Sequence, residues 1–501
     1  MSNFRPINRD TGFLLPPSVD EWLPQRHLAR FVVEVIDGLD LTELVKEYRG
    51  SGSASYHPAM LLSMLVYGYA TKVFSSRALE RATYDSVAFR FIAGNEHPDH
   101  DTIAAFRKRF LGQVEAVFMQ VLQLARTMGM LKLGTVALDG TKVHANASRH
   151  SALSFAHAKK LEKQLKREVQ QLLKLAERAD AAEIPDGMSI PEELERRESR
   201  LAAIAEAKAK LEVRAEERLE RDQAQYQRRL AVRAEKEKRR GRRFGGTPPE
   251  PPTGGVREGD QINLTDEDSR IMKVAAGGFE QCYNAQAAVA SGSLLVVATG
   301  VTQAANDNGQ LVPMVKKLKA LPKALGRAKR LLADCGYLSQ ANVEYCAQAH
   351  IEPLIAMGPS DHNLSWRQRF AATPTAVPSS ATPMQKMAYQ LKTARGKRLY
   401  ALRKQTPEPV FGIIKSAMGY RQCLLRGLKN VTGEWNLVTM SWNIKRMFAL
   451  QLCWFPLLIS TLAINSARRA SRGRTSTPSS ARSTGSAASS CSPRSGKSAP
   501  S

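Results

Sequence analysis

A long charged segment, residues 155–243, constrains the fold of this 501-residue chain more than any other feature, because it separates two regions of different pattern. Aliphatic residues recur within it every three or four positions, with Lys, Arg and Glu between them; they include Leu161, Leu165, Val169, Leu172, Leu201, Ile204 and Leu211. This spacing predicts two helices that bury a shared seam. Pro185 and Gly187 lie between the two runs and predict the turn. We therefore expect a coiled-coil-like hairpin inserted into another domain.

The regions that flank this segment predict an α/β domain in two parts, residues 131–154 and 261–465. Within residues 134–143, an apolar and β-branched stretch ends in Asp139-Gly140, which is typical of a buried strand that runs into a turn. After the insertion and a Gly/Pro-rich linker, residues 244–260, the pattern predicts a β-hairpin over 289–301 and a helix over 312–321. A second apolar strand then ends at Asp334, before a helix over 339–349 and a strand over 351–357.

The first 130 residues predict a helical N-terminal domain. Asp101 has the position of an N-cap for a helix over 102–110, which carries Arg107, Lys108 and Arg109. A short basic helix after a turn can enter a DNA groove. A bundle helix with a solvated basic face has the same spacing, so the pattern leaves both interpretations open.

The charge balance favours a polyanionic partner, since 73 Lys and Arg face 47 Asp and Glu for a net charge of +26. Nucleic acid and an anionic membrane surface both meet this requirement. The run 448–464 is apolar but short for a membrane span and contains Pro456, so we expect a buried helix there. The six cysteines form no CxxC pair, which favours a reducing, cytoplasmic compartment. Residues 466–501 hold seven Lys and Arg and no acid, and predict a disordered basic tail.

Three acidic residues are candidates for chemistry. Asp139 and Asp334 each follow an apolar strand, where α/β folds build their sites, although a turn or cap role is the alternative for each. Glu408 is the single acid among eleven Lys and Arg between Lys386 and Lys429, and it is either a metal ligand or a first-turn helix residue.

Other polar residues are weaker candidates. Asp307 has a polar, Gly-adjacent setting that indicates a turn, so we leave it out of the catalytic set. His97 and His100 lack a further ligand pair and indicate a polar loop, and Asp266 and Asp268 indicate surface or capping positions. Nucleotide-hydrolase and serine-hydrolase chemistry are disfavoured, because the sequence has no GxxxxGK[ST] loop and no GxSxG elbow.

Taken in order, several blocks resemble the DDE transposases of bacterial insertion sequences, in the branch with a Tyr-Arg-Glu-Lys signature. The blocks are Ala137-Leu-Asp-Gly-Thr141, residues 261–272, Gln281-Cys-Tyr-Asn-Ala-Gln286, Ala333-Asp-Cys-Gly-Tyr337 and Tyr400…Arg403…Glu408…Lys415. The resemblance covers roughly residues 10–465. Four residues separate Arg403 from Glu408, where the usual signature has three. Either Lys404 fills the arginine position, or the loop holds one extra residue.

This resemblance implies an RNase H-like catalytic domain, with the helical hairpin inserted after the first catalytic strand. It implies an enzyme that cleaves the ends of a mobile element and transfers the cut strands into target DNA. It also implies that Asp139, Asp334 and Glu408 are the catalytic residues and bind two divalent ions, Mg²⁺ or Mn²⁺. Tyr400, Arg403, Lys404 and Lys415 would bind DNA near the site, and Arg107, Lys108 and Arg109 would bind it from the N-terminal domain. A homo-oligomer on paired ends, without membrane association, is expected in the cytoplasm at the nucleoid. A catalytically inactive DNA-binding remnant and a nuclease of the same fold are the alternatives.

Overall fold

A mixed β-sheet carries the α/β part of the chain in the computed structural model, which describes residues 18–46, 48, 55–177, 189–243, 245–274, 277–358 and 380–451. Its strands are β1 (Leu133–His144), β4 (Arg270–Lys273), β5 (Phe279–Ala290), β6 (Val296–Thr302), β7 (Gly326–Ala333) and β8 (Glu352–Ile355). The order is β4-β5-β1-β7-β8, with β6 also paired to β5. β1 is antiparallel to β5 and parallel to β7, and β7 is parallel to β8.

The strand predicted over 134–143 is observed as β1, but the prediction that it ends at Asp139 is wrong. β1 continues to His144, because β5 pairs with it as far as the register His144↔Cys282. Its pairing with β7, in contrast, reaches only Ala137↔Leu332. Asp139 therefore lies inside a strand, just beyond the point where the neighbouring parallel strand stops.

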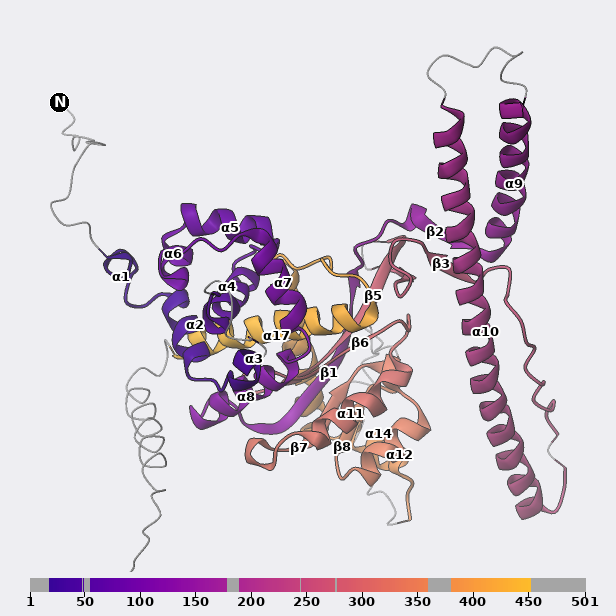
Figure 1. The fold of residues 1–501 in the computed structure, drawn as a ribbon. Coiled ribbons are helices and arrows are strands. Elements are labelled where there is room, and N and C mark those ends of the chain that lie inside the picture. Colours follow the sequence, from indigo (N-terminus) through magenta and orange to yellow (C-terminus); the bar gives the residue numbers. More distant parts are fainter. Residues whose placement is uncertain are drawn as a thin grey trace, which may run out of the picture. The chain divides into compact units, whose positions relative to one another are not determined.

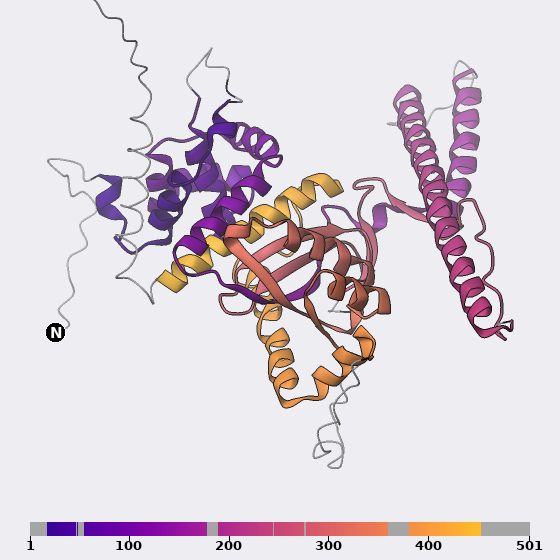
Figure 2. The same ribbon diagram turned by 90° about the horizontal axis from the view of Figure 1, so that it is seen from below.

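Helices cover both faces of this sheet. On one face, α14 (Pro383–Lys392), α15 (Ala394–Gln405) and α16 (Pro407–Lys415) follow one another, and Leu399 and Tyr400 pack on buried Ala137, Leu332 and Leu354. Figure 2 shows these helices, in orange, side by side along the sheet. On the other face lies α11 (Leu311–Ala320), close enough for Met314 to limit the space at Gly300. The helix α12 (Gln340–Gln348) precedes the edge strand β8.

The N-terminal part is helical, as predicted. Its helices are α1 (Val19–Trp22), α2 (Leu28–Asp37), α3 (Thr42–Lys46), α4 (Pro58–Ala70), α5 (Ser76–Asp85), α6 (Val87–Ala93), α7 (His100–Phe110) and α8 (Val114–Thr127). They share one hydrophobic cluster with the sheet through α17 (Leu428–Gln451), the yellow helix of Figure 1. Buried Glu434 on α17 accepts a hydrogen bond from Tyr69 of α4 at 2.9 Å. The boundary predicted near residue 130 is thus crossed by continuous packing.

The predicted N-cap at Asp101 is wrong by two residues. The cap of α7 is Asp99, whose Oδ1 accepts from the main-chain N–H of Thr102 at 2.7 Å. A capping side chain must reach the N–H two or three residues further along the chain, and Asp101 already lies in the first turn.

Within the segment 155–243 the described helices are α9 (Phe155–Glu177) and α10 (Ile190–Arg240), the paired purple helices of Figure 1. The turn predicted at Pro185 and Gly187 lies outside the described residues. In the chain the two helices lie between the two strands of a short antiparallel pair, β2 (Ala152–Ser154) and β3 (Gln261–Asn263). Their seam consists of two small clusters, distinct from the main one, that include Leu165, Ile204 and Leu211. The predicted linker runs back beside α10, since Arg233 donates to the carbonyls of Gly246 and Thr247.

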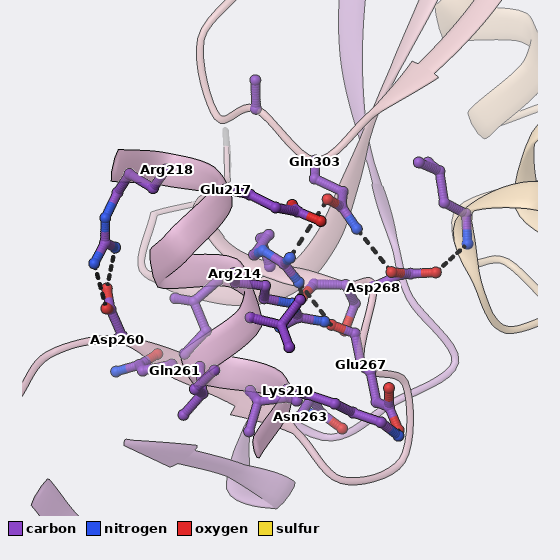
Figure 3. Close-up of a pocket in the computed structure, with 18 of the residues that line it drawn as sticks. Lys210, Arg214, Glu217, Arg218, Asp260, Gln261, Asn263, Glu267, Asp268 and Gln303 are labelled. Atoms are coloured by element: carbon purple, nitrogen blue, oxygen red, sulfur yellow. Dashed lines mark hydrogen bonds and ion pairs between the residues drawn. The ribbon is translucent and has the colours of Figure 1, made fainter. Parts of the chain in front are cut away.

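Charged side chains join α10 to the segment around β3. Figure 3 shows this lining, where Arg218 pairs with Asp260 at 2.8 Å and Lys210 pairs with Glu267 at 2.6 Å. Arg214 donates to the main-chain oxygen of Glu267 at 2.9 Å. The open pocket beside these residues has a volume of about 1180 Å³ and is lined by side chains of both charges. These contacts orient the hairpin without adding to the main hydrophobic cluster.

No helix in the described part of the chain is both long and apolar enough to span a bilayer. The run 448–464 contributes the end of α17 as far as Gln451, and its remainder lies outside the described residues, as does the predicted tail 466–501.

The hairpin should be removable without loss of the main fold. Ser154 and Gln261 are partners in the β2–β3 pair, so an Asn-Gly turn in place of residues 155–260 closes a two-residue hairpin. We expect this chain to keep a cooperative thermal transition and the near-ultraviolet signal of buried Trp435, because the main cluster is left intact.

Leu331→Ala serves as the matched control, since it truncates a fully buried side chain of the main cluster and should cost about 2–5 kcal/mol. Loss of the cooperative transition in the shortened chain would show instead that the hairpin is part of the core.

Candidate active site

Asp139 is a mostly buried carboxylate on β1, with 16% of its side chain exposed. Its Oδ1 accepts the main-chain N–H of Gly140 at 2.8 Å. Burial, with smaller contributions from the negative charges of Asp334 and Asp307, raises the pKa of Asp139 to about 7, although the Gly140 hydrogen bond and Arg403 act in the opposite direction. A carboxyl group with this pKa readily exchanges a proton for a cation near neutral pH.

Asp334 follows the last residue of β7 and caps a short 3₁₀ turn, Cys335–Tyr337. Its Oδ1 accepts from the N–H of Gly336 at 2.9 Å. The negative charge of Asp334 is one of the causes of the raised pKa of Asp139. The two acids come from parallel neighbours, β1 and β7, at the edge where their pairing ends.

Glu408 lies in the first turn of α16, directly after Pro407, and about half of its side chain is exposed. Arg403, near the end of α15, links it to the strand acid: Nη2 donates to Glu408 Oε1 at 3.0 Å, and Nη1 lies 3.8 Å from Asp139 Oδ2. One guanidinium thus contacts the carboxylates of residues 139 and 408, which are 269 positions apart in the sequence.

Arg403, and not Lys404, faces the acids. The side chain of Arg403 is 14% exposed, whereas Lys404 is exposed to solvent. Between Arg403 and Glu408, α15 ends at Gln405 and α16 begins at Pro407, with Thr406 between the two helices. Proline at the start of a helix costs no hydrogen bond, since its missing N–H would have no partner there.

Tyr400 and Lys415 make main-chain contacts that fix these helices to the strands. Tyr400 donates to the carbonyl of Ala333 at 3.3 Å, and Lys415 donates to the carbonyl of Lys142 at 2.7 Å. Burial raises the pKa of Tyr400 and lowers the pKa of Lys415. Both side chains therefore help to hold Glu408 opposite β1, in addition to any role toward DNA.

The three basic residues of α7 have different environments. Arg107 is buried and donates to the carbonyl of Phe74 at 3.1 Å, so its contact is internal. Lys108 and Arg109 are exposed, and the Arg109 guanidinium lies over the ring of Tyr48 at 5.2 Å. The surface of α7 that is open to a ligand is thus carried by Lys108 and Arg109.

Sequence reasoning missed a polar cluster beside Asp139. Asn284 and Gln286 on β5 are buried, and both donate to Asp307 Oδ1 at 2.7 Å. A side chain at Gly140 would meet this cluster, since a Cβ there would lie 2.6 Å from Asp307 Oδ1. The only signal in the sequence was the Asn-Ala-Gln block at 284–286, and nothing in its pattern indicated a contact with Asp307.

The carboxylates are hard oxygen donors, which suit Mg²⁺ or Mn²⁺. Within the described residues, however, no three His, Cys, Asp or Glu side chains converge into a group that could hold a metal ion. Arg403 is the positive charge that lies between Asp139 and Glu408.

Two stretches of the chain match models of known protein families. Residues 17–109 match the model "Transposase domain (DUF772)", and residues 368–448 match the model "Transposase DDE domain". The second match includes Arg403, Glu408 and Lys415. These two matches support a DDE transposase of insertion-sequence type. No curated protein and no solved structure matched the sequence.

A DDE transposase is an enzyme that cleaves DNA and joins the cut end to a target by transesterification. The resemblance read from the sequence is therefore confirmed at the level of family and reaction. The net charge of +26 agrees with a DNA substrate. The first match ends before Asp139 and the second begins after Asp334, so neither match includes these two aspartates. Their catalytic role stays a prediction.

The raised pKa of Asp139 predicts how stability depends on pH in this transposase. The folded state holds the proton up to about pH 7, whereas the unfolded chain releases it near pH 4, so stability falls as pH rises between these values. Asp139→Asn removes this penalty. In EDTA at pH 8 the variant should be more stable than the wild type by on the order of 1 kcal/mol or more, and the gap should close toward pH 4.

Thermal melts between pH 4 and 8 test this expectation, with Asp85→Asn as a control because Asp85 is exposed at the end of α5. Equal pH profiles for the wild type and the Asp139 variant would contradict the raised pKa.

Substitution of Arg403 and Lys404 separates their roles. Arg403→Gln removes the charge between Asp139 and Glu408, so cleavage of an element-end duplex should fall by at least about tenfold, or about 1.4 kcal/mol. Lys404→Gln should lower DNA affinity slightly and leave the cleavage rate of bound DNA nearly unchanged. A larger cleavage defect for the Lys404 variant would assign the signature position to Lys404.

Proposed function

We propose that this transposase cuts and joins DNA with Asp139, Asp334 and Glu408 as its three carboxylates. The observation that carries the proposal is the shared environment of these acids. Asp139 and Glu408 contact the same guanidinium, and the charge of Asp334 acts on Asp139. Asp139 on β1 is thus linked to the end of β7 by the charge of Asp334 and to α16 by Arg403, although no local pattern connects the three acids.

The catalytic domain is proposed to be RNase H-like. In support, β5 is antiparallel to β1 and β6 is antiparallel to β5 on one side of β1, while on the other side β7 is parallel to β1 and β8 is parallel to β7. The hairpin α9–α10 leaves the chain after β1 and returns before β4 and β5, which agrees with an insertion after the first catalytic strand.

The donor set suits two divalent ions, Mg²⁺ or Mn²⁺. Asp139 would hold both ions, with Asp334 completing one site and Glu408 the other. When bound, the two ions stabilise charge on the attacking and leaving oxygens of the phosphodiester. The raised pKa of Asp139 means that its proton is lost close to neutral pH, which favours cation binding from about pH 7 upward.

The chain's own side chains would orient the substrate around these acids. Arg403 has the planar, charged fork that matches a phosphate in two hydrogen bonds, and it is already directed to this edge of the sheet. Tyr400 and Lys415 would hold α15 and α16 in place through Ala333 and Lys142, as their hydrogen bonds suggest.

DNA would also contact the exposed basic residues Lys404, Lys108 and Arg109, which lie far apart in sequence. A homo-oligomer on paired ends follows from the need to join two ends to one target. Action at the nucleoid in the cytoplasm follows from the same substrate. Arg107 is not included, because its guanidinium is buried.

Charge removal at each acid tests the assignment. Glu408→Gln, Asp139→Asn and Asp334→Asn keep shape and polarity but remove a ligand charge, so cleavage should fall by at least about a hundredfold, or about 2.7 kcal/mol, while DNA binding persists. The assay is cleavage of a labelled element-end duplex with Mg²⁺ or Mn²⁺, at matched protein concentration and with folding confirmed by melting.

If Glu408 were only a first-turn helix residue, its loss would cost about 0.3–1 kcal/mol of helix stability and cleavage would survive. Wild-type protein that binds the duplex but does not cut it would favour the inactive remnant. Cutting without joining to a target duplex would favour the nuclease.

A further inference from the structure

Asp307 occupies the turn that the sequence predicts, but its side chain is not free in solvent. It lies immediately before the 3₁₀ turn Asn308–Gln310, which leads into α11. Its Oδ1 accepts hydrogen bonds from Asn284 and Gln286, both at 2.7 Å, and those two side chains are 0% and 1% exposed. A partly exposed carboxylate thus satisfies two buried amides of the central strand β5.

The side-chain amide of Gln286 links Asp307 to the turn that follows Asp334. Its Nε2 donates to Asp307, and its Oε1 accepts from the hydroxyl of fully buried Tyr337. Tyr337 is the last residue of the turn capped by Asp334. A chain of two hydrogen bonds therefore connects the side chain of Asp307 with the backbone that orients Asp334.

A second contact joins the same two turns. Asn342 Nδ2 donates to the carbonyl of Asn308 and to the carbonyl of Tyr337, both at 2.8 Å. Lys142 on β1 donates to the carbonyl of Ala305 at 2.6 Å, which ties the Asp307 turn to the strand of Asp139. Gly140 and Gly336 leave the room for this arrangement, because a Cβ at either position would contact Asp307.

We propose that Asp307 is a positioning residue of the transposase, which fixes the Asp334 turn beside Asp139 through Gln286 and Tyr337. This inference rests on the proposed function, in which Asp139 and Asp334 hold an ion. Asp307 is not itself a ligand: it acts by keeping the second carboxylate aligned with the first.

The direction of the hydrogen bonds requires an acceptor at position 307, and a charged acceptor strengthens them. An ionised Asp only accepts, so both Asn284 and Gln286 must turn an NH₂ group toward it, which leaves the oxygen of Gln286 for the Tyr337 hydroxyl. Both amides donate to the same oxygen, Oδ1, so the carbonyl oxygen of an Asn at position 307 has the capacity to accept both. The Asn lacks the negative charge, however, and hydrogen bonds to an ionised acceptor are roughly twice as strong as those to a neutral one. Asp307→Asn therefore weakens the two contacts that hold Gln286 in its orientation toward Tyr337.

Asp307→Asn in the full-length protein tests the proposal, with Asn306→Ala as the matched control because Asn306 is exposed in the same turn. Mn²⁺ is titrated with two readouts: the rise in melting temperature without DNA, and the cleavage of an element-end duplex. We expect Asp307→Asn to raise the half-saturating Mn²⁺ concentration by about tenfold in both readouts, as loss of an outer contact does at metal sites. Duplex binding without metal should not change.

Tyr337→Phe removes only the hydroxyl that donates to Gln286, so it should give a similar shift, and it carries the test if the Asp307 variant does not fold. The double variant should be no worse than the stronger single variant, since both break one chain of contacts.

An Asp307 variant that titrates like the Asn306 control, or single effects that add independently, would overturn the inference. If Mn²⁺ raises the melting temperature of the wild type but not of Asp139→Asn, the proposed function stands even when the Asp307 variant behaves like the control. If Asp139→Asn cleaves normally and Mn²⁺ has no effect on the wild type, the proposed function fails, and the inference fails with it.

Discussion

The unequal pairing of β1 with its two neighbours is the constraint on which the site depends. β5 pairs with β1 through His144, but β7 pairs with it only as far as Ala137, so Asp139 lies in a rigid strand with one side open. The continuing β5 pairing keeps the carboxylate mostly buried, and burial is the main cause of its raised pKa. The early end of β7 leaves space for Asp334 and for Arg403. A longer β7 would fill that space with a strand.

Much of this arrangement could be predicted from local sequence. Apolar runs located β1 and β7, and helical spacing located α11, α12 and the hairpin α9–α10, because these signals depend only on neighbouring residues. The length of β1 could not be predicted in the same way. Asp139-Gly140 has the local pattern of a turn, and the strand continues there only because β5, more than a hundred residues later, supplies its hydrogen bonds. Non-local pairing therefore overrode the local signal.

The site residues also differ in whether local sequence or non-local contacts determine their position. The acids stood out by type and position, but the choice between Arg403 and Lys404 depends on where α15 ends, which one extra residue in the signature obscured. Asp307 was set aside as a turn residue, and it does lie in a turn. Its contacts with Asn284 and Gln286 come from a strand about twenty residues earlier, so neither spacing nor residue type indicated them.

Placing these carboxylates together opposes stability, and the surrounding contacts offset that cost. Asp139 is buried where its charged form is disfavoured, so the folded chain without a cation is stabilised by keeping a proton or by Arg403. Arg403 is directed to this edge by α15, which Tyr400 fixes to Ala333. Any cation that binds both Asp139 and Glu408 must compete with that guanidinium. Arg403 would therefore balance the two acids in the absence of a cation, and its guanidinium has the planar fork that matches a phosphate of the substrate.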